Sequence, residues 1–162
     1  MLKLVFLDID GVLRTGRSIT NNNGKARPFD PEAIYNLNKI IKETNCKIVL
    51  SSLWRYVYNL EQTKEMFSLE GLPPECIIGL NFINNNEENY SIDQFEQRGM
   101  YCLEWIKSYS KNNDFDGKIK YVVIDDMIDI LANLPEETIF ITDSFFGLTT
   151  EISNDIITYL NS

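Results

Sequence analysis

The amino-acid sequence predicts a three-layer α/β fold in which a doubly wound, mostly parallel sheet lies between two layers of helices. Short apolar segments alternate along the chain with longer segments whose apolar residues recur at helical spacing. Polar and acidic residues directly follow several of the apolar segments, as expected where ligands bind at the carboxyl ends of parallel strands. The length of 162 residues, with 44% hydrophobic residues, indicates a single domain over residues 1–162.

The first half of the chain predicts two strands, each followed by a helical segment. Residues 3–7 are mostly apolar, which is typical of a strand that is buried on both faces. A helix is expected over residues 31–44, because Asp30 is a favourable N-cap and a proline follows it at the first helical position. Residues 47–50 (KIVL) predict a second buried strand, and an amphipathic stretch follows it through Met66.

The second half of the chain continues the same alternation. Three further strands are predicted, at residues 76–78, 121–124 and 138–141. After the first of them, an Asn-rich loop over residues 81–90 leads to a helix that opens with a capping box of Ser91 and Gln94. Four residues form the apolar side of this helix: Phe95, Cys102, Leu103 and Ile106.

The composition limits the classes of protein to which the chain can belong. The formal net charge of −9 argues against broad binding to nucleic acid or anionic lipid. Histidine is absent and the three cysteines form no C-x-x-C pair, so neither a zinc site nor a disulfide framework is expected. No apolar run is long enough to cross a membrane, and Asp8 interrupts the N-terminal one before it can act as a signal peptide. We therefore expect a cytoplasmic protein without membrane contact or an evident obligate protein partner.

The segment from Gly11 to Phe29 has a charge opposite to that of the whole chain. It contains no acidic residue and four basic ones: Arg14, Arg17, Lys25 and Arg27. Such a run is usually a solvated loop. Because this one directly follows two aspartates at the end of a strand, we expect it to meet an anionic substrate.

Those two aspartates, Asp8 and Asp10, are spaced so that an extended chain would place both on one side. Two carboxylates held together require a shared cation or proton. A calcium-binding loop is excluded because its glycine would be the sixth residue and a glutamate the twelfth, whereas here Gly11 is fourth and Ile19 is twelfth. A P-loop ATPase is excluded because the chain has no G-x-x-x-x-G-K-[ST] motif. A receiver domain fits poorly, since its acidic pair and its acceptor aspartate lie on different strands.

Four segments in this order resemble the motifs of the haloacid dehalogenase-like (HAD) superfamily of phosphatases. They are LVFLDIDGVL at 4–13, VLSS at 49–52, the basic residue Arg98 on a later helix and VVIDD at 122–126. Three longer segments resemble, more narrowly, the HAD domain of Swiss Army Knife RNA repair proteins: SSLWR at 51–55, RGMYCLEWI at 98–106 and TDSFFGLT at 142–149. This resemblance covers nearly the whole chain and implies a Rossmann-like HAD fold with magnesium-dependent phosphatase activity.

The resemblance implies roles for the acidic residues. Asp8 would be the nucleophile that forms an aspartyl-phosphate intermediate. Asp10 would protonate the leaving alcohol and then deprotonate the attacking water. The side chains of Asp8 and Asp125, the latter with Asp126 as its partner or alternative, would hold Mg²⁺ together with the main-chain carbonyl of Asp10.

The resemblance also implies ligands for the phosphate. Ser51, with Ser52 beside it, would donate a hydroxyl to a phosphate oxygen. Arg98 would supply the positive charge that the superfamily more often takes from lysine, and Lys107 on the same helix is its alternative. Three further residues are candidates for contacts with the rest of the substrate: Arg14, Arg55 and Asp143.

Each assignment outside the first aspartate pair has a structural alternative. Ser51 would then cap the helix that follows it, and Asp126 would be the N-cap of a helix near residues 127–131. Arg98 would form a surface ion pair with Glu96 or Glu104.

The spacing of the predicted elements also bears on the substrate. Roughly twenty residues follow the first strand, and fewer follow the third, which is too short for an inserted cap domain. A capless site suits a phosphate at the end of a large molecule such as a nucleic acid. A mononucleotide is the alternative, because Phe29, Trp54 and Tyr56 would be able to stack a base. A catalytically idle binding or regulatory domain is the third alternative.

Overall fold

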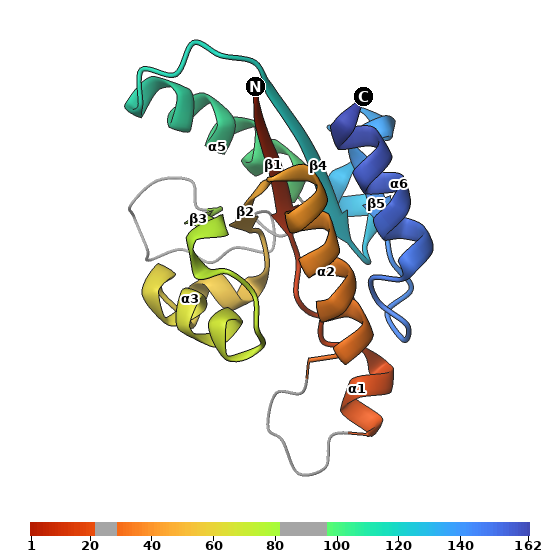
Figure 1. The fold of residues 1–162 in the computed structure, drawn as a ribbon. Coiled ribbons are helices and arrows are strands. Elements are labelled where there is room, and N and C mark those ends of the chain that lie inside the picture. Colours follow the sequence, from red (N-terminus) through yellow and green to blue (C-terminus); the bar gives the residue numbers. More distant parts are fainter. Residues whose placement is uncertain (22–28, 82–96) are drawn as a thin grey trace.

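The computed structural model describes residues 1–21, 29–81 and 97–162 (Figure 1). Five strands form one sheet: β1 (Leu2–Leu7), β2 (Lys47–Leu50), β3 (Ile77–Leu80), β4 (Ile119–Asp125) and β5 (Ile139–Ile141). Their order is β3-β2-β1-β4-β5, and every neighbouring pair is parallel. The predicted α/β fold with a doubly wound sheet is therefore confirmed.

Helices lie on both faces of this sheet, and the short helix α1 (Gly16–Thr20) lies beyond its end (Figure 1). The other described helices are α2 (Pro31–Thr44), α3 (Leu60–Leu69), α5 (Arg98–Asn112) and α6 (Thr150–Asn161). Helices α2 and α6 pack side by side over one face, and α5 lies on the other (Figure 1). Four short 3₁₀ helices lie in the described connections, the last two of them both between β4 and β5: Leu53–Tyr56, Pro74–Cys76, Ile128–Leu131 and Glu136–Thr138.

Two apolar clusters meet at the central strand. Val5 and Leu7 of β1 face the larger cluster, which contains side chains of α2, α3 and α6. Leu4 and Phe6 face the second cluster with Cys102 of α5. Because successive side chains of a strand point to opposite faces, burial on both sides makes β1 a nearly continuous apolar run. Its end is consequently held in a fixed position.

Several predicted boundaries agree with the structure. Helix α2 spans the predicted residues, and the Asp30 carboxylate accepts hydrogen bonds from the amides of Glu32 and Ala33 as its N-cap. The third strand is shifted, because the chain forms a 3₁₀ turn through Cys76 and becomes extended only at Ile77.

Other predictions meet the limits of the structure. Residues 82–90, the capping box of Ser91 and Gln94, and Phe95 lie outside the described residues, as does part of each segment to which the capless prediction applies. Between β1 and α2 the described residues contain only the short helix α1. Helix α6 has no counterpart among the predicted elements. Within the described ranges, no helix combines the length and apolar character needed to span a membrane.

Candidate active site

The register of the sheet aligns the ends of its three central strands. Leu7 of β1 lies opposite Leu50 of β2 and Ile124 of β4. Asp8, Ser51 and Asp125, which come one position later, therefore lie side by side at the carboxyl edge. Main-chain hydrogen bonds continue across this edge, from the Asp8 amide to the Ile124 carbonyl at 3.0 Å and from the Ser51 amide to the Leu7 carbonyl at 2.8 Å.

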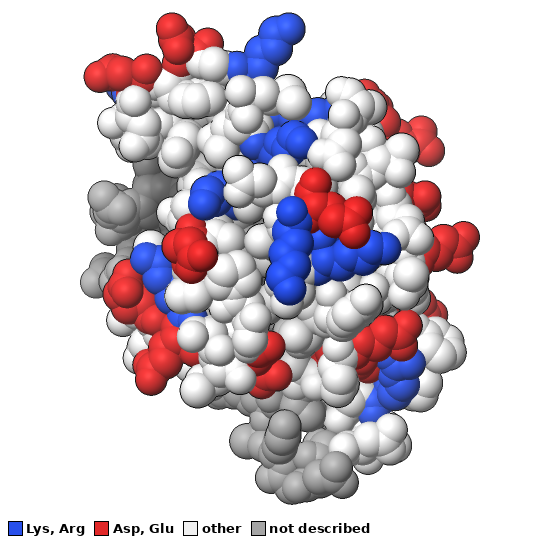
Figure 2. Space-filling model, viewed as in Figure 1, with Lys and Arg blue, Asp and Glu red and all other residues white. Residues whose placement is uncertain are grey.

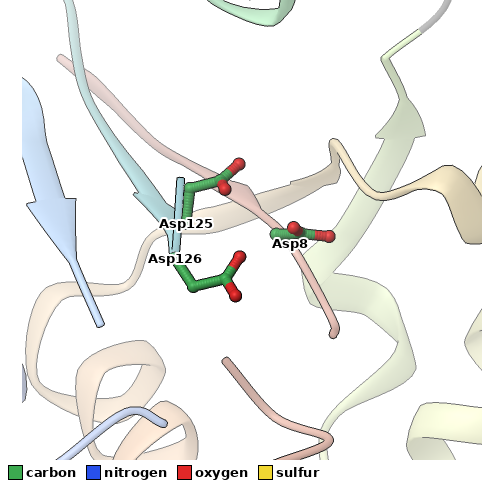
Figure 3. A group of neighbouring side chains, drawn as sticks. All are labelled: Asp8, Asp125 and Asp126. Atoms are coloured by element: carbon green, nitrogen blue, oxygen red, sulfur yellow. The ribbon is translucent and has the colours of Figure 1, made fainter. Parts of the chain in front are cut away.

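Three carboxylates converge at this edge. Asp8, Asp125 and Asp126 each offer one oxygen, and these oxygens lie within 4.8 Å of one another (Figure 3). Asp8 and Asp125 are buried, and Asp126 is partly exposed. Carboxylate oxygens are the protein ligands that Mg²⁺ takes, and it needs only one or two of them because it keeps several waters. The donor set therefore fits a magnesium ion.

The guanidinium of Arg98 is the cation of this cluster. Arg98 is the first residue of α5 and is buried, and its Nη1 donates to Asp8 Oδ2 at 2.7 Å and also to Asp125 Oδ2. Lys107, the alternative cation, is exposed on the same helix. The structural alternative for Arg98, a surface pair with Glu104, does not describe this buried geometry, and Glu96 lies outside the described residues.

Burial and mutual repulsion affect the ionisation of the cluster. Burial, followed by the negative charge of Asp8, raises the pKa of Asp125 to about 7. The same two causes raise the pKa of Asp126. Burial opposes the charge of Arg98, but its two carboxylate partners more than offset this and raise the pKa of the guanidinium. Arg98 thus brings one positive charge against the three carboxylates that it adjoins, a balance that a divalent cation would improve.

A glycine keeps the space beside this cluster clear. Gly11 has a φ of +78°, which a side chain rarely permits. A Cβ at this position would lie 2.2 Å from Asp126 Oδ2, so any larger residue would displace that carboxylate. The loop after β1 is also fixed from β5, because the Thr142 hydroxyl donates to the Gly11 carbonyl at 2.8 Å.

The carboxylate of Asp10 lies outside the three-carboxylate cluster. Its Oδ1 accepts a hydrogen bond from Arg14 Nη1 at 2.8 Å, and its Oδ2 accepts one from the indole Nε1 of Trp54 at 2.8 Å. Half of the Asp10 side chain is exposed. Arg14, a candidate for substrate contact, therefore lies next to the candidate acid, and Trp54 contacts the same group from the loop after β2.

The two serines after β2 have different partners. The Ser51 hydroxyl is buried, accepts a hydrogen bond from Asn81 Nδ2 at 3.1 Å and also hydrogen-bonds with the Cys102 thiol. Ser52 accepts from the Trp54 amide at 3.4 Å and is the N-cap of the following 3₁₀ helix. The capping role considered for Ser51 thus belongs to Ser52.

Two other candidates have contacts that hold the loops. Arg55 is buried, and its Nη1 donates to the main-chain carbonyls of Ser51 and Ser52, both at 2.8 Å. Burial lowers the pKa of this guanidinium. Asp143 is exposed, and its Oδ1 accepts from the amides of Phe145 and Phe146. Arg55 thus supports the main chain of the loop after β2, and Asp143 stabilises the turn after β5.

Arg17 of the basic segment is paired with carboxylates of α2 and its cap. Its guanidinium donates to Asp30 at 2.8 Å and to Glu32 at 2.9 Å. Both acids follow directly after the basic segment, which was counted from Gly11 to Phe29, so they were left out of its charge. Lys25 and Arg27 lie outside the described residues. Figure 2 shows both signs of charge interspersed over the face that it displays.

The three aromatic residues expected to stack a base occupy different positions. Trp54 is 9% exposed and packs against Phe29, with 5.8 Å between their ring centroids. Both belong to the larger apolar cluster or pack against it, so they are not free to receive a base. Tyr56 is exposed, and the guanidinium of Arg55 lies over its ring.

The sequence reading missed two of these site contacts. The first is the hydrogen bond from Asn81 to Ser51. Asn81 was predicted only as the start of a loop, but it directly follows β3, so the reasoning applied to the other strand ends would have identified it as a site residue. The contact between Trp54 and Asp10 joins residues 44 positions apart and has no local signal.

The chain also matches a known protein family. A model described as the HAD domain in Swiss Army Knife RNA repair proteins matches residues 4–152. Neither curated proteins nor solved structures yield a match. The matched range includes all of the residues that converge at the carboxyl edge of the sheet.

Proposed function

Because the chain belongs to the family of HAD domains found in Swiss Army Knife RNA repair proteins, we propose that it is a magnesium-dependent phosphomonoester hydrolase. The observation that carries this proposal is the cluster of Asp8, Asp125 and Asp126 beside the buried cation of Arg98. Asp10 lies next to this cluster in the chain and has a different set of contacts. Nucleophile, acid and charge-neutralising groups are thereby available at one edge.

Asp8 is the proposed nucleophile. Its Oδ1 accepts a hydrogen bond from the Ile9 amide at 2.7 Å, and its Oδ2 accepts one from Arg98 Nη1. These two bonds hold the carboxylate in one orientation. One of its oxygens attacks phosphorus, a bond to the leaving oxygen breaks, and the phosphoryl group remains on Asp8. The Ser51 hydroxyl, which directly follows β2 at the same edge of the sheet, would donate to a phosphate oxygen.

Asp10 is the proposed acid and base. It gives its proton to the leaving alcohol as the first bond breaks. It then takes a proton from the water that attacks the phosphoryl group, which releases inorganic phosphate and restores Asp8. A half-exposed carboxyl group outside the metal cluster suits these two transfers.

Asp8, Asp125 and Asp126 would hold Mg²⁺, with the main-chain carbonyl of Asp10 as a further ligand. When bound, the ion supplies positive charge that lets an anionic nucleophile approach an anionic phosphate. The excess of carboxylates over cations in the described cluster supports this assignment.

We further propose that the phosphate lies at the end of a nucleic acid. The main support is that this family of HAD domains occurs in RNA repair proteins. The charge of the basic segment adds little support for a nucleic-acid substrate, because Arg17 is paired with carboxylates of α2 and its cap. A mononucleotide remains the alternative substrate.

Hydrolysis assays test this function. Wild-type protein, Asp8→Asn and the control Asp129→Asn, an exposed aspartate outside the cluster, would be compared with Mg²⁺ and with EDTA. We expect turnover that needs Mg²⁺, is lost in Asp8→Asn and is unchanged in Asp129→Asn. Absence of turnover in the wild type across oligonucleotides with 5′ or 3′ phosphates and mononucleotides would indicate an idle domain. Equal kcat/KM for mononucleotides and oligonucleotides would remove the preference for a nucleic-acid end.

A further inference from the structure

The carboxyl group of Asp10 is held from two sides by donors that differ in their exposure. Trp54 Nε1 donates to its Oδ2, and Arg14 Nη1 donates to its Oδ1, each at 2.8 Å. The Arg14 side chain is 28% exposed and pairs with Asp10 from four residues along the chain. Trp54 comes from the loop after β2 and is nearly buried.

The indole of Trp54 is fixed by its surroundings. Its amide is hydrogen-bonded to the Ser52 hydroxyl, which caps the short helix that carries it. Its ring lies against Phe29 and Tyr58, with centroid distances of 5.8 and 5.7 Å. A buried indole N–H normally requires an acceptor. Asp10 is that acceptor, so any movement of its Oδ2 away from Trp54 would leave a buried donor without this bond.

Resting on the proposed function, we propose that Trp54 is a positioning residue that fixes Oδ2 of Asp10 and thereby makes Oδ1 the oxygen that transfers the proton. Oδ1 is contacted by Arg14, whose side chain is partly exposed, and in this proposal Arg14 releases Oδ1 when substrate arrives. In the first step the proton passes from Oδ1 to the leaving oxygen as its bond to phosphorus breaks. In the second step Oδ1 receives a proton from water as the water oxygen bonds to phosphorus and the Asp8–phosphorus bond breaks.

Trp54→Phe tests this role, because it removes the N–H and keeps an aromatic ring. We expect kcat for glycerol 2-phosphate to fall about tenfold, the scale of one hydrogen bond to a charged group. The loss for p-nitrophenyl phosphate should be much smaller, because its leaving group needs little protonation. KM should stay within about twofold for both substrates, since each retains the same phosphate contacts. Trp105→Phe, in the second apolar cluster, is the matched control and should leave both rates unchanged.

A double-mutant cycle separates positioning from a general loss of structure. In Asp10→Asn the proton transfer is already absent, so adding Trp54→Phe should reduce kcat little further. Equal losses on both substrates, or losses that simply multiply in the double variant, would overturn the proposal.

A measurement without catalysis keeps the proposal testable if the protein hydrolyses no phosphate. The chain has two tryptophans, so Trp105→Phe leaves Trp54 as its only one. We expect Asp10→Ala in this background to change the emission maximum or quantum yield of Trp54. Asp129→Ala, at an exposed site outside the cluster, should not. An emission spectrum that does not respond to Asp10→Ala would contradict the contact, whatever the outcome of the hydrolysis assays.

Discussion

The stability of the metal-free protein should rise as the pH falls from 8 to 5.5. Burial and the charge of Asp8 raise the pKa of Asp125 in the folded protein from 3.8 to about 7. The folded state therefore binds a proton in a pH range in which the unfolded chain does not. This contribution is lost as the pH rises through 7. The raised pKa of Asp126 acts in the same direction.

The size of this effect follows from the difference in pKa. Each pH unit below the pKa of Asp125 in the folded protein adds about 1.4 kcal/mol to the free energy of unfolding. The interval from pH 7 to 5.5 therefore adds about 2 kcal/mol. The chain contains no histidine, the residue that most often dominates this pH range. Asp125 should therefore account for most of the observed dependence.

Urea unfolding in EDTA, followed by circular dichroism between pH 5.5 and 8, measures the effect. As the pH falls from 8 to 5.5, the free energy of unfolding should rise by about 2 kcal/mol in the wild type and in the exposed-site variant Asp129→Asn. Asp125→Asn should lose most of the dependence. In the wild type, saturating Mg²⁺ should reverse the pH dependence, so that stability rises with pH, because the ion binds the ionised carboxylates. A wild-type stability that is flat in EDTA, or a full slope in Asp125→Asn, would refute the assignment.

Further predictions concern single residues of the site. Asp10→Asn should lower kcat for alkyl phosphates at least about a hundredfold, with a smaller loss for p-nitrophenyl phosphate; steady-state kinetics on both would show equal losses if Asp10 is not the acid. Gly11→Ala should cost about 1 kcal/mol of stability through its positive φ and weaken Mg²⁺ binding by displacing Asp126; an unchanged calorimetric Kd would contradict this. Arg98→Met should lower kcat/KM by tenfold or more, the scale of a charge-assisted contact, and Lys107→Met should not; equal effects would contradict the choice of cation.

The fold was predictable because its strands and caps have local signals. The apolar run of β1 and the cap at Asp30 depend on residues within a few positions of one another. Helix α6 was equally predictable, since Ile152, Ile156 and Leu160 recur at helical spacing behind the cap at Thr149, but it was not among the predicted elements.

The site was predictable only in part, because its contacts join distant segments. Motif order was enough to place Asp8, Arg98 and Asp125 together. The partners of Arg17 were missed because the counted segment ended one residue before Asp30. The hydrogen bond from Trp54 to Asp10 depends on the packing of the β2 loop, which no local pattern records.

The position of β1 at the centre of the sheet has a consequence for how the chain folds. One of its neighbours, β2, is the next strand in the chain, but the other, β4, comes much later. The pairing with β4 places Leu2 opposite Ile119. During synthesis, β1 emerges long before β4, the strand that covers one of its edges. Such distant pairing slows folding, and an apolar strand with an unpaired edge is prone to association with other chains. The same arrangement that aligns Asp8 with Asp125 therefore makes β1 the segment most dependent on protection while the chain is incomplete.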